Sequence, residues 1–156
     1  MPTDESVLLT LHPGDVGVAT RGDRLETLLG SCVAIVLTDP RRTVGVMCHI
    51  VHSQGTSAAT RQSTAHADVA FDSMVALLRE RGIAAQLCNA YVYGGGNMFP
   101  HLVQRATIGD DNVARVLELL EQNDIPVLHA DVGGSVYRQL RWTVGFDQPS
   151  VSAVAV

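Results

Sequence analysis

The stretch from Leu29 to His49 constrains the fold most strongly, because it holds two apolar runs on either side of a turn signal. The runs are VAIVL at 33–37 and VGVMCHIV at 44–51, and both are rich in β-branched residues. Asp39-Pro40 favours a turn between them, since proline presets its own φ and aspartate bonds nearby backbone amides. The sequence therefore predicts an antiparallel hairpin.

Folding this hairpin about the Pro40–Arg41 bond places Cys32 directly opposite His49. Directly opposite residues share a sheet face, with Cβ atoms about 4.5–5.5 Å apart. A thiol and an imidazole at that distance can share a proton, which is the minimum for a cysteine nucleophile. A register slip of one residue would turn one of the two side chains to the opposite face of the sheet. A slip of two would keep the residues on the same face as diagonal neighbours. The alternative is a small buried cysteine beside a hydrogen-bonded strand histidine.

The residues near Cys32 and a later glycine run are candidates for holding a substrate. Gly30 permits close approach of a ligand, and the local amides can serve a developing oxyanion. The run GGGNM at 94–98 lacks the Gly-Lys-Ser/Thr of a phosphate loop, so it is either a backbone loop beside a substrate or a plain turn. We expect the substrate site to include Gly30, Ser31, Gly95 and Asn97.

A metal site built on Cys48, His49 and His52 is the main chemical alternative. Cys48 and His49 are adjacent, so on a strand their side chains point to opposite faces. The remaining cysteine and histidines are scattered and show no structural-zinc spacing. We therefore expect neither a metal nor a cofactor.

Composition narrows the functional class. The chain has 156 residues, 46% of them hydrophobic, which predicts one globular domain over residues 1–156. The formal net charge of −5 and the lack of a basic run argue against a nucleic-acid partner. All 11 basic residues are arginine, so Schiff-base chemistry on lysine is excluded.

The same sequence predicts a cytoplasmic protein. It has three cysteines, an odd number that does not indicate a disulfide framework. Its first residues lack the pattern of a signal peptide, and no apolar run approaches the roughly 20 residues of a membrane span. We expect reduced thiols and no membrane insertion.

The chain alternates between strand and helix patterns without a linker. We expect an α/β fold of mixed, partly antiparallel sheets with two helices packed on one side. The expected elements are opening hairpins from strands at 7–12, 15–20 and 25–29, a polar loop at 52–65, a helix at 65–81, a strand at 84–93, a helix from about Asp110 capped by Asp110 or Gly109, strands at 125–131 and 139–144, and an edge strand at 151–156.

Several motifs occur together in a recognisable order. They are LGSCVA at 29–34, Asp39-Pro40, Met47-Cys48-His49, Asp68 with Ala70, GGGNM at 94–98, Ile108-Gly109 with Asn112, and DVGG at 131–134 with Arg138. In this order and at these spacings the chain resembles the CheD family of chemoreceptor glutamine deamidases, from about Val16 to Gly145.

The resemblance implies a three-layer α/β fold, similar to the deamidase domain of cytotoxic necrotizing factor. It implies hydrolysis of glutamine side chains on methyl-accepting chemoreceptors to glutamate and ammonia. By the same resemblance Cys32 is the nucleophile and His49 the general base. The implied partners are the cytoplasmic helices of chemoreceptors and a CheC-like phosphatase.

The family's third catalytic residue is a threonine shortly before the cysteine. Counting back without a gap places Glu26 at that position, with Thr27 next to it. Adjacent strand residues face opposite ways, so Thr27 takes the role only after a local shift. A carboxylate at Glu26 would orient His49 more strongly than a hydroxyl, and both residues stay candidates.

Other positions depart from the family pattern. His52-Ser53 stands where Leu-Pro is usual, His66 replaces a tyrosine, and Tyr137 replaces a glycine before Arg138. These departures motivate a second hypothesis, a catalytically weakened CheD-like binding module that regulates a CheC-type phosphatase or receptors. A third hypothesis is an amidase that acts on an unrelated substrate.

Overall fold

The computed structural model describes residues 6–53, 63–102 and 107–156, so most of the expected 52–65 loop lies outside the described residues. The elements are β1 (Leu8–Leu11), β2 (Val16–Thr20), β3 (Arg24–Leu29), β4 (Val33–Thr38), β5 (Val44–Cys48), α2 (Ala67–Glu80), the short 3₁₀ helix η1 (Ala85–Leu87), β6 (Asn89–Gly94), α3 (Ile108–Gln122), β7 (Val127–Val132), β8 (Val136–Thr143) and β9 (Ser150–Ala155).

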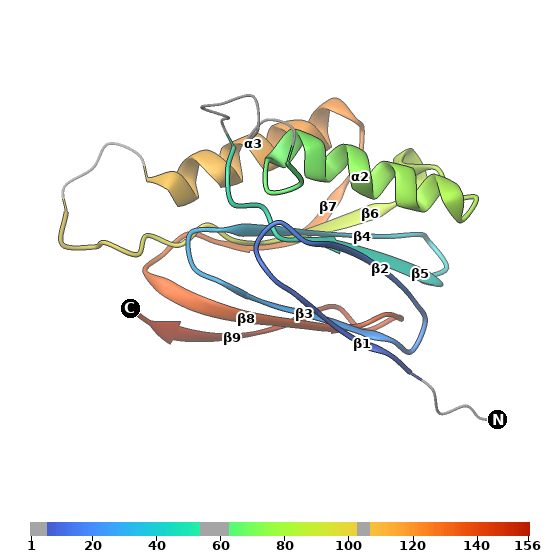
Figure 1. Ribbon diagram of the computed structural model, residues 1–156, viewed down its shortest axis with the longest axis horizontal. Coiled ribbons are helices and arrows are strands. Elements are labelled where there is room, and N and C mark those ends of the chain that lie inside the picture. Colours follow the sequence, from blue (N-terminus) through green and yellow to red (C-terminus); the bar gives the residue numbers. More distant parts are fainter. Residues whose placement is uncertain (1–5, 54–62, 103–106) are drawn as a thin grey trace.

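These elements form three layers (Figure 1). A five-stranded sheet in the order β2-β5-β4-β6-β7 forms the middle layer, with α2 and α3 side by side on one face. A second sheet, in the order β1-β3-β8-β9, covers the other face. The predicted α/β architecture, with mixed sheets and both helices on one side, is confirmed.

Strand β4 is buried on both faces, and all six of its residues are inaccessible. Val33, Ile35 and Leu37 pack toward the helices, whereas Ala34 and Val36 pack toward the second sheet. A strand covered on both sides favours a nearly continuous apolar run, and the one polar residue, Thr38, donates its hydroxyl to the Val44 carbonyl at 2.9 Å. This explains the unbroken apolar run in the sequence.

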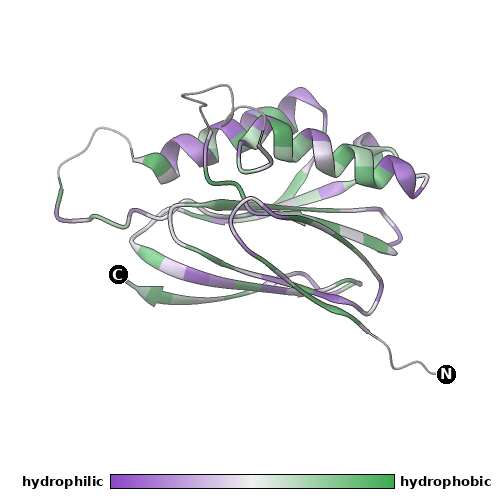
Figure 2. Cartoon of the chain, viewed as in Figure 1, coloured by the Kyte–Doolittle hydropathy of each residue, from purple (hydrophilic) through white to green (hydrophobic). Residues whose placement is uncertain are grey.

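Helix α2 lies within the expected range of 65–81. His66 is the N-cap, and its side chain accepts a hydrogen bond from the backbone N–H of Asp68. Both helices carry hydrophilic and hydrophobic residues along their length (Figure 2). This is expected of helices that pack one face on a sheet. Among the described residues, no helix is long and apolar enough to cross a bilayer.

Helix α3 begins at Ile108, two residues earlier than expected, and its cap is neither Gly109 nor Asp110. Thr107 is the N-cap and forms a capping box with Asp110, in which each side chain accepts from the other residue's backbone N–H. The earlier start brings Gly109 into the first turn, where the helix packs closely on Gly95.

The register of the β4–β5 hairpin corrects the direct pairing of Cys32 with His49. Val36 pairs with Met47, and an isolated bridge joins Val33 to Ile50. In this register His49 lies opposite Ala34, and Cys32 is its diagonal neighbour on the same face. The difference is a slip of two, which preserves the shared face.

The turn explains this slip. It is longer than a turn centred on Pro40–Arg41, and Arg42 takes a left-handed conformation with φ 56°. The Asp39 carboxylate accepts hydrogen bonds from the backbone N–H groups of Thr43 and Val44, at 2.8 and 3.0 Å. Aspartate thus caps a wider loop, which moves the centre of the hairpin by one residue.

Three other expectations also need correction. The chain does not open with hairpins, because β1 runs parallel to β3 in one sheet while β2 pairs with β5 in the other. The strand expected from residue 84 begins at Asn89, since residues 85–87 form the 3₁₀ helix. Strand β8 begins at Val136, three residues early, whereas β9 confirms the expected edge strand.

Gly45 of β5 lets the Trp142 ring of the other sheet pack directly against the strand backbone. A Cβ atom there would lie 2.3 Å from the Trp142 ring, whereas one at Gly17, on a neighbouring strand, would meet side chains at an ordinary 3.5 Å. We expect Gly45→Ala to lower the free energy of unfolding by about 1–3 kcal/mol through overpacking. Gly17→Ala should leave it unchanged or raise it by up to about 1 kcal/mol. Urea unfolding of both variants tests this, and equal effects would contradict it.

Candidate active site

The candidate site lies where β3 of one sheet faces β5 of the other. Leu25, Thr27 and Leu29 point inward along β3, so Thr27 is buried and its hydroxyl lies 2.6 Å from Nδ1 of His49. Glu26 points to the outer face, where its carboxylate is 3.7 Å from Nε of Arg141. Of the two candidates for the third residue, the structure brings Thr27 to His49 and places Glu26 on the other side of the sheet.

The hydrogen bonds of Thr27 define the protonation of His49. The Thr27 hydroxyl donates its single proton to the backbone carbonyl of Leu11, at 2.8 Å. We therefore assign the hydrogen of the contact with His49 to Nδ1, with the Thr27 hydroxyl as acceptor, because this arrangement satisfies all three groups. This tautomer leaves Nε2 with a free lone pair, as a general base requires.

Burial keeps both candidate reactive groups neutral. It lowers the pKa of His49 to about 4, an effect that nearby Asp15 partly opposes and His12 reinforces. Burial also raises the pKa of the Cys32 thiol. At pH 7 the free protein therefore holds a thiol and an uncharged imidazole.

The turn between β1 and β2 supports His49 through its backbone. The Gly14 N–H donates to the carbonyl of His49 at 2.9 Å, and the His49 N–H donates to the carbonyl of Asp15 at 3.1 Å. These bonds extend the pairing between β2 and β5 beyond Cys48. They fix the backbone from which the imidazole reaches Thr27.

The three cysteines have different surroundings. Cys32 is partly accessible and packs at the edge of the core between the sheets. Cys48 and Cys88 are buried in the core beneath the helices, where burial raises the pKa of Cys48 to about 12 and that of Cys88 to about 11. Cys48 faces away from His49, as the strand alternation predicted.

The glycine run after β6 supports the Cys32 loop from behind. The N–H of Gly95 donates to the carbonyl of Cys32, and that of Gly96 donates to the carbonyl of Gly30, both at 2.9 Å. A Cβ atom on Gly94 would lie 2.2 Å from the Cys32 carbonyl oxygen, and Gly94 has φ 112°. Only glycine permits this approach. The Gly95 amide is thus committed to Cys32.

The predicted substrate residues divide into two groups. Ser31 and Asn97 line a pocket together with Gly96, Met98, Phe99, Thr107, Ile108 and Gly109. Gly30 and Gly95 are part of the supporting backbone instead: a Cβ on Gly30 would lie 3.0 Å from the Met98 sulfur, and Gly95 is enclosed by α3. The pocket opens beside Ser31, the residue before Cys32.

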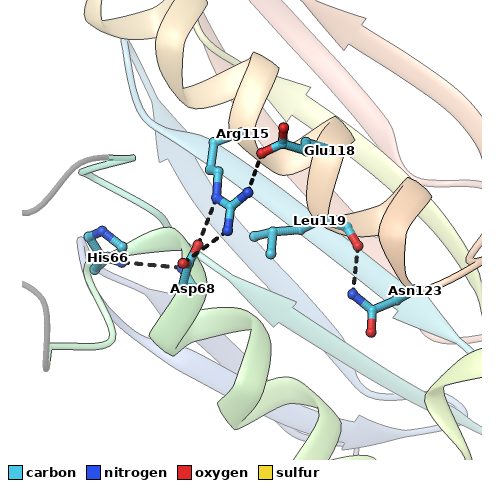
Figure 3. Close-up of polar contacts among 6 residues, drawn as sticks. All are labelled: His66, Asp68, Arg115, Glu118, Leu119 and Asn123. Atoms are coloured by element: carbon cyan, nitrogen blue, oxygen red, sulfur yellow. Dashed lines mark hydrogen bonds and ion pairs between the residues drawn. The ribbon is translucent and has the colours of Figure 1, made fainter.

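Two arginines hold the surrounding elements together. Arg138 is buried and donates to the carbonyls of Gly94 and Gly133, at 3.3 and 2.7 Å, and to the carboxylate of Asp131. Arg115 of α3 pairs with Asp68 at the start of α2, at 2.9 Å (Figure 3). The hydrogen bonds from Arg115 lower the pKa of the Asp68 carboxyl.

Sequence reasoning missed the role of Asn112 in this region. Its side-chain amide is fully buried on α3 and donates to the carbonyls of Ser31 and Val51, at 3.2 and 3.1 Å. The available signal was a polar residue at helical spacing from Gly109 and Val116 on the buried face. Among the described residues, no group of three or more His, Cys, Asp or Glu side chains is arranged to hold a metal.

Comparison with known proteins agrees with this architecture. Residues 51–146 match the family model described as CheD chemotactic sensory transduction. A Pseudomonas fluorescens protein named "Probable chemoreceptor glutamine deamidase CheD" is 35% identical over 88% of this chain and 77% of its own length. An Albidiferax ferrireducens protein named "Probable chemoreceptor glutamine deamidase CheD 2" is 34% identical over 86% of this chain and 80% of its own length. These matches are longer than the family-model match and extend N-terminally beyond it.

A more distant relative and a solved structure widen the comparison. The CheD protein of Methanococcus maripaludis, also named a probable chemoreceptor glutamine deamidase, is 29% identical over 86% of this chain and 87% of its own length. A crystal structure of a Neisseria meningitidis protein assigned to the DUF152 family model superposes with a TM-score of 0.53 at 12% identity. It covers 90% of this chain and 76% of that one, and it shows a shared fold.

Nitrogen-15 NMR of the imidazole rings tests the state of His49. At pH 7 we expect Nδ1 to carry the hydrogen and Nε2 to be bare, because the Thr27 proton is directed to the Leu11 carbonyl. The ring should titrate with a midpoint near the pKa of about 4 that burial imposes. His49→Gln identifies the signal by its loss. A hydrogen on Nε2, or a midpoint near the ordinary value of about 6.5, would contradict this assignment.

Proposed function

Because this chain belongs to the CheD family, we propose that it is a protein-glutamine deamidase that converts chemoreceptor glutamines to glutamate with release of ammonia. Cys32 is the nucleophile and His49 the general base in this proposal. The observation that carries it is the 2.6 Å contact between Thr27 and Nδ1 of His49. It orients the imidazole, with Nε2 free, on the sheet face that also bears Cys32.

The acylation step uses both reactive groups. Nε2 of His49 takes the thiol proton as Sγ of Cys32 bonds to the side-chain carbonyl carbon of glutamine. The carbon–nitrogen bond then breaks, and the imidazolium gives its proton to the departing nitrogen. Ammonia leaves, and the acyl group stays on Cys32 as a thioester.

Water completes the reaction. Neutral His49 removes a proton from water, which attacks the thioester carbonyl and yields glutamate. The proton then returns to the Cys32 sulfur, so the protein ends as it began. Each general-acid or general-base step contributes roughly 10²–10⁴-fold to the rate.

The pKa directions favour proton transfer during the attack over a preformed thiolate–imidazolium pair. Burial disfavours both ions, because it raises the pKa of Cys32 and lowers that of His49 to about 4. A neutral pair costs less to hold between two sheets. The charges then form together with the bond to the substrate, where Thr27 accepts from the imidazolium.

The substrate proposal follows from family membership and the shape of the site. Phe99 and Ile108 are strongly exposed beside the pocket at Ser31, so they offer an apolar rim to a protein surface. We propose the cytoplasmic helices of chemoreceptors as the substrate, with a CheC-like phosphatase as a second partner. The protein's formal net charge of −5 does not favour nucleic acid.

Mass spectrometry of receptor cytoplasmic fragments tests the activity. Each deamidation replaces NH₂ by OH, and we expect wild-type protein to produce this gain of about 1 Da at specific glutamines. Cys32→Ala should abolish it, because no other side chain supplies the nucleophile. Cys88→Ala is the matched control and should retain activity, since Cys88 is buried in the other core. Equal rates for wild type and Cys32→Ala would sink the mechanism.

A second pair of variants assigns the third residue. We expect Thr27→Val to reduce kcat by about 10–100-fold, because it keeps the shape but leaves Nδ1 without an acceptor and frees the ring to turn. Glu26→Gln should stay within about threefold of wild type, since its carboxylate lies on the outer face. Steady-state ammonia release measures both. A large loss in Glu26→Gln together with normal Thr27→Val would reverse the assignment.

A further inference from the structure

The Asn112 side chain makes two bonds that fix its orientation. Its NH₂ group donates to the carbonyls of Ser31 and Val51, which precede and follow the two strands of the Cys32 hairpin. Turning the amide over would place its oxygen against both carbonyl oxygens, so only one orientation is compatible with these neighbours. Asn112 therefore holds the Ser31 carbonyl toward α3.

A held carbonyl also aims the N–H of the same peptide unit. No peptide bond in the described chain is cis, and in a trans peptide the C=O and N–H groups point in opposite directions. Since the Ser31 carbonyl points to Asn112, the Cys32 N–H points away from α3. Among the described residues, this N–H has no hydrogen-bond acceptor.

The neighbouring peptide units are fixed by different partners. The Gly30 carbonyl accepts from the Gly96 N–H, and the Cys32 carbonyl accepts from the Gly95 N–H, both at 2.9 Å. The glycine run thus holds the units on either side of the Ser31–Cys32 peptide. The Ser31–Cys32 peptide unit, which contains the Cys32 N–H, is instead oriented by the side chain of Asn112.

We propose that Asn112 is a positioning residue that aims the Cys32 N–H at the oxyanion formed when Cys32 attacks a carbonyl group. The bond to Val51 is its second anchor, on the segment that follows His49. The inference rests on the proposed role of Cys32 as nucleophile, but it applies to any acyl substrate. Loss of the Asn112 amide frees the peptide unit to rotate and misdirects the donor.

Two small reagents separate this role from a general effect on the thiol. With 4-nitrophenyl acetate, the Cys32 sulfur bonds to the carbonyl carbon, His49 takes the thiol proton, and 4-nitrophenolate leaves after an oxyanion has formed. With iodoacetamide, His49 takes the thiol proton, the sulfur displaces iodide from a CH₂ carbon, and no oxyanion forms. Peptide-resolved mass spectrometry gives the rate of each reaction at Cys32.

Asn123 provides a matched control on the same helix. Its NH₂ group donates to the Leu119 carbonyl at 2.7 Å, at the far end of α3 from the site (Figure 3). Asn112→Ala and Asn123→Ala thus each remove an asparagine that binds backbone carbonyl groups. Thermal unfolding of both variants establishes the temperature at which they are compared as folded proteins.

We expect Asn112→Ala to lower the ratio of acylation rate to alkylation rate by about 10–100-fold. Complete removal of an oxyanion donor costs about 10²–10³, and a misdirected donor should cost less. Alkylation alone should stay within about threefold, as should both rates in Asn123→Ala. If Asn112→Ala does not fold, Asn112→Ser, which retains one donor in a smaller side chain, is measured instead and should show an intermediate loss.

Two results would overturn the inference. One is an unchanged ratio in a folded Asn112 variant, which would make the residue purely structural. The other is a parallel fall in both rates, which would mean that Asn112 acts on the thiol. Wild-type protein that reacts as expected with both reagents but deamidates no receptor glutamine would contradict the proposed function and leave this inference standing.

Discussion

The close approach of two backbone loops, one at Gly94–Gly96 and one at Cys32, is the constraint on which the site depends. Backbone N–H groups of the first loop bind carbonyls of the second, and a Cβ at Gly94 would collide with the Cys32 carbonyl. The glycine loop binds the carbonyls of Gly30 and Cys32, whereas the Ser31 carbonyl between them is bound by Asn112 of α3. The glycine run is therefore a template that shapes the nucleophile loop, and its amides are not free to bind a substrate.

The position of the site between two sheets determines its chemistry. Water is largely excluded from Thr27 and His49, so neither an imidazolium nor a thiolate is stable there before substrate arrives. If Cys32 is the nucleophile, as we propose, its neutral thiol is less reactive before substrate binds. In the proposed mechanism, the Thr27 hydroxyl, Nε2 of His49 and the Cys32 N–H act on charge as it develops, where low polarity makes each of them more effective.

Period-two alternation and long apolar runs were sufficient for mixed sheets with two helices on one side and for the shared face of Cys32 and His49, whereas the three layers were implied by the family resemblance. It was insufficient for the exact register, since the wide loop at Asp39 depends on how one carboxylate caps the backbone. Thr27 alternates with the apolar residues Leu25 and Leu29, a pattern that indicates an inward side chain. Aligning the chain to the family without a gap pointed to Glu26 instead. The spacing of Asn112 indicated a buried polar residue, but its two carbonyl partners were beyond prediction, because they come from distant segments.

The departures from the family pattern lie outside the contact between Thr27 and His49, and this favours turnover over a purely binding role. His66 caps α2, and His52 forms an isolated bridge with it, so both serve the scaffold. Tyr137 is exposed, and its ring would contact a Cβ placed on Gly30, which sets it at the rim of the nucleophile loop. A module that had lost catalysis would have no need to keep a buried hydroxyl bonded to a buried, uncharged imidazole. Burying polar groups lowers the stability of the fold unless they are hydrogen-bonded, and apolar residues could occupy the same space without that risk. The rim residues vary the surface that a substrate meets, while the groups that would carry out the reaction stay in place.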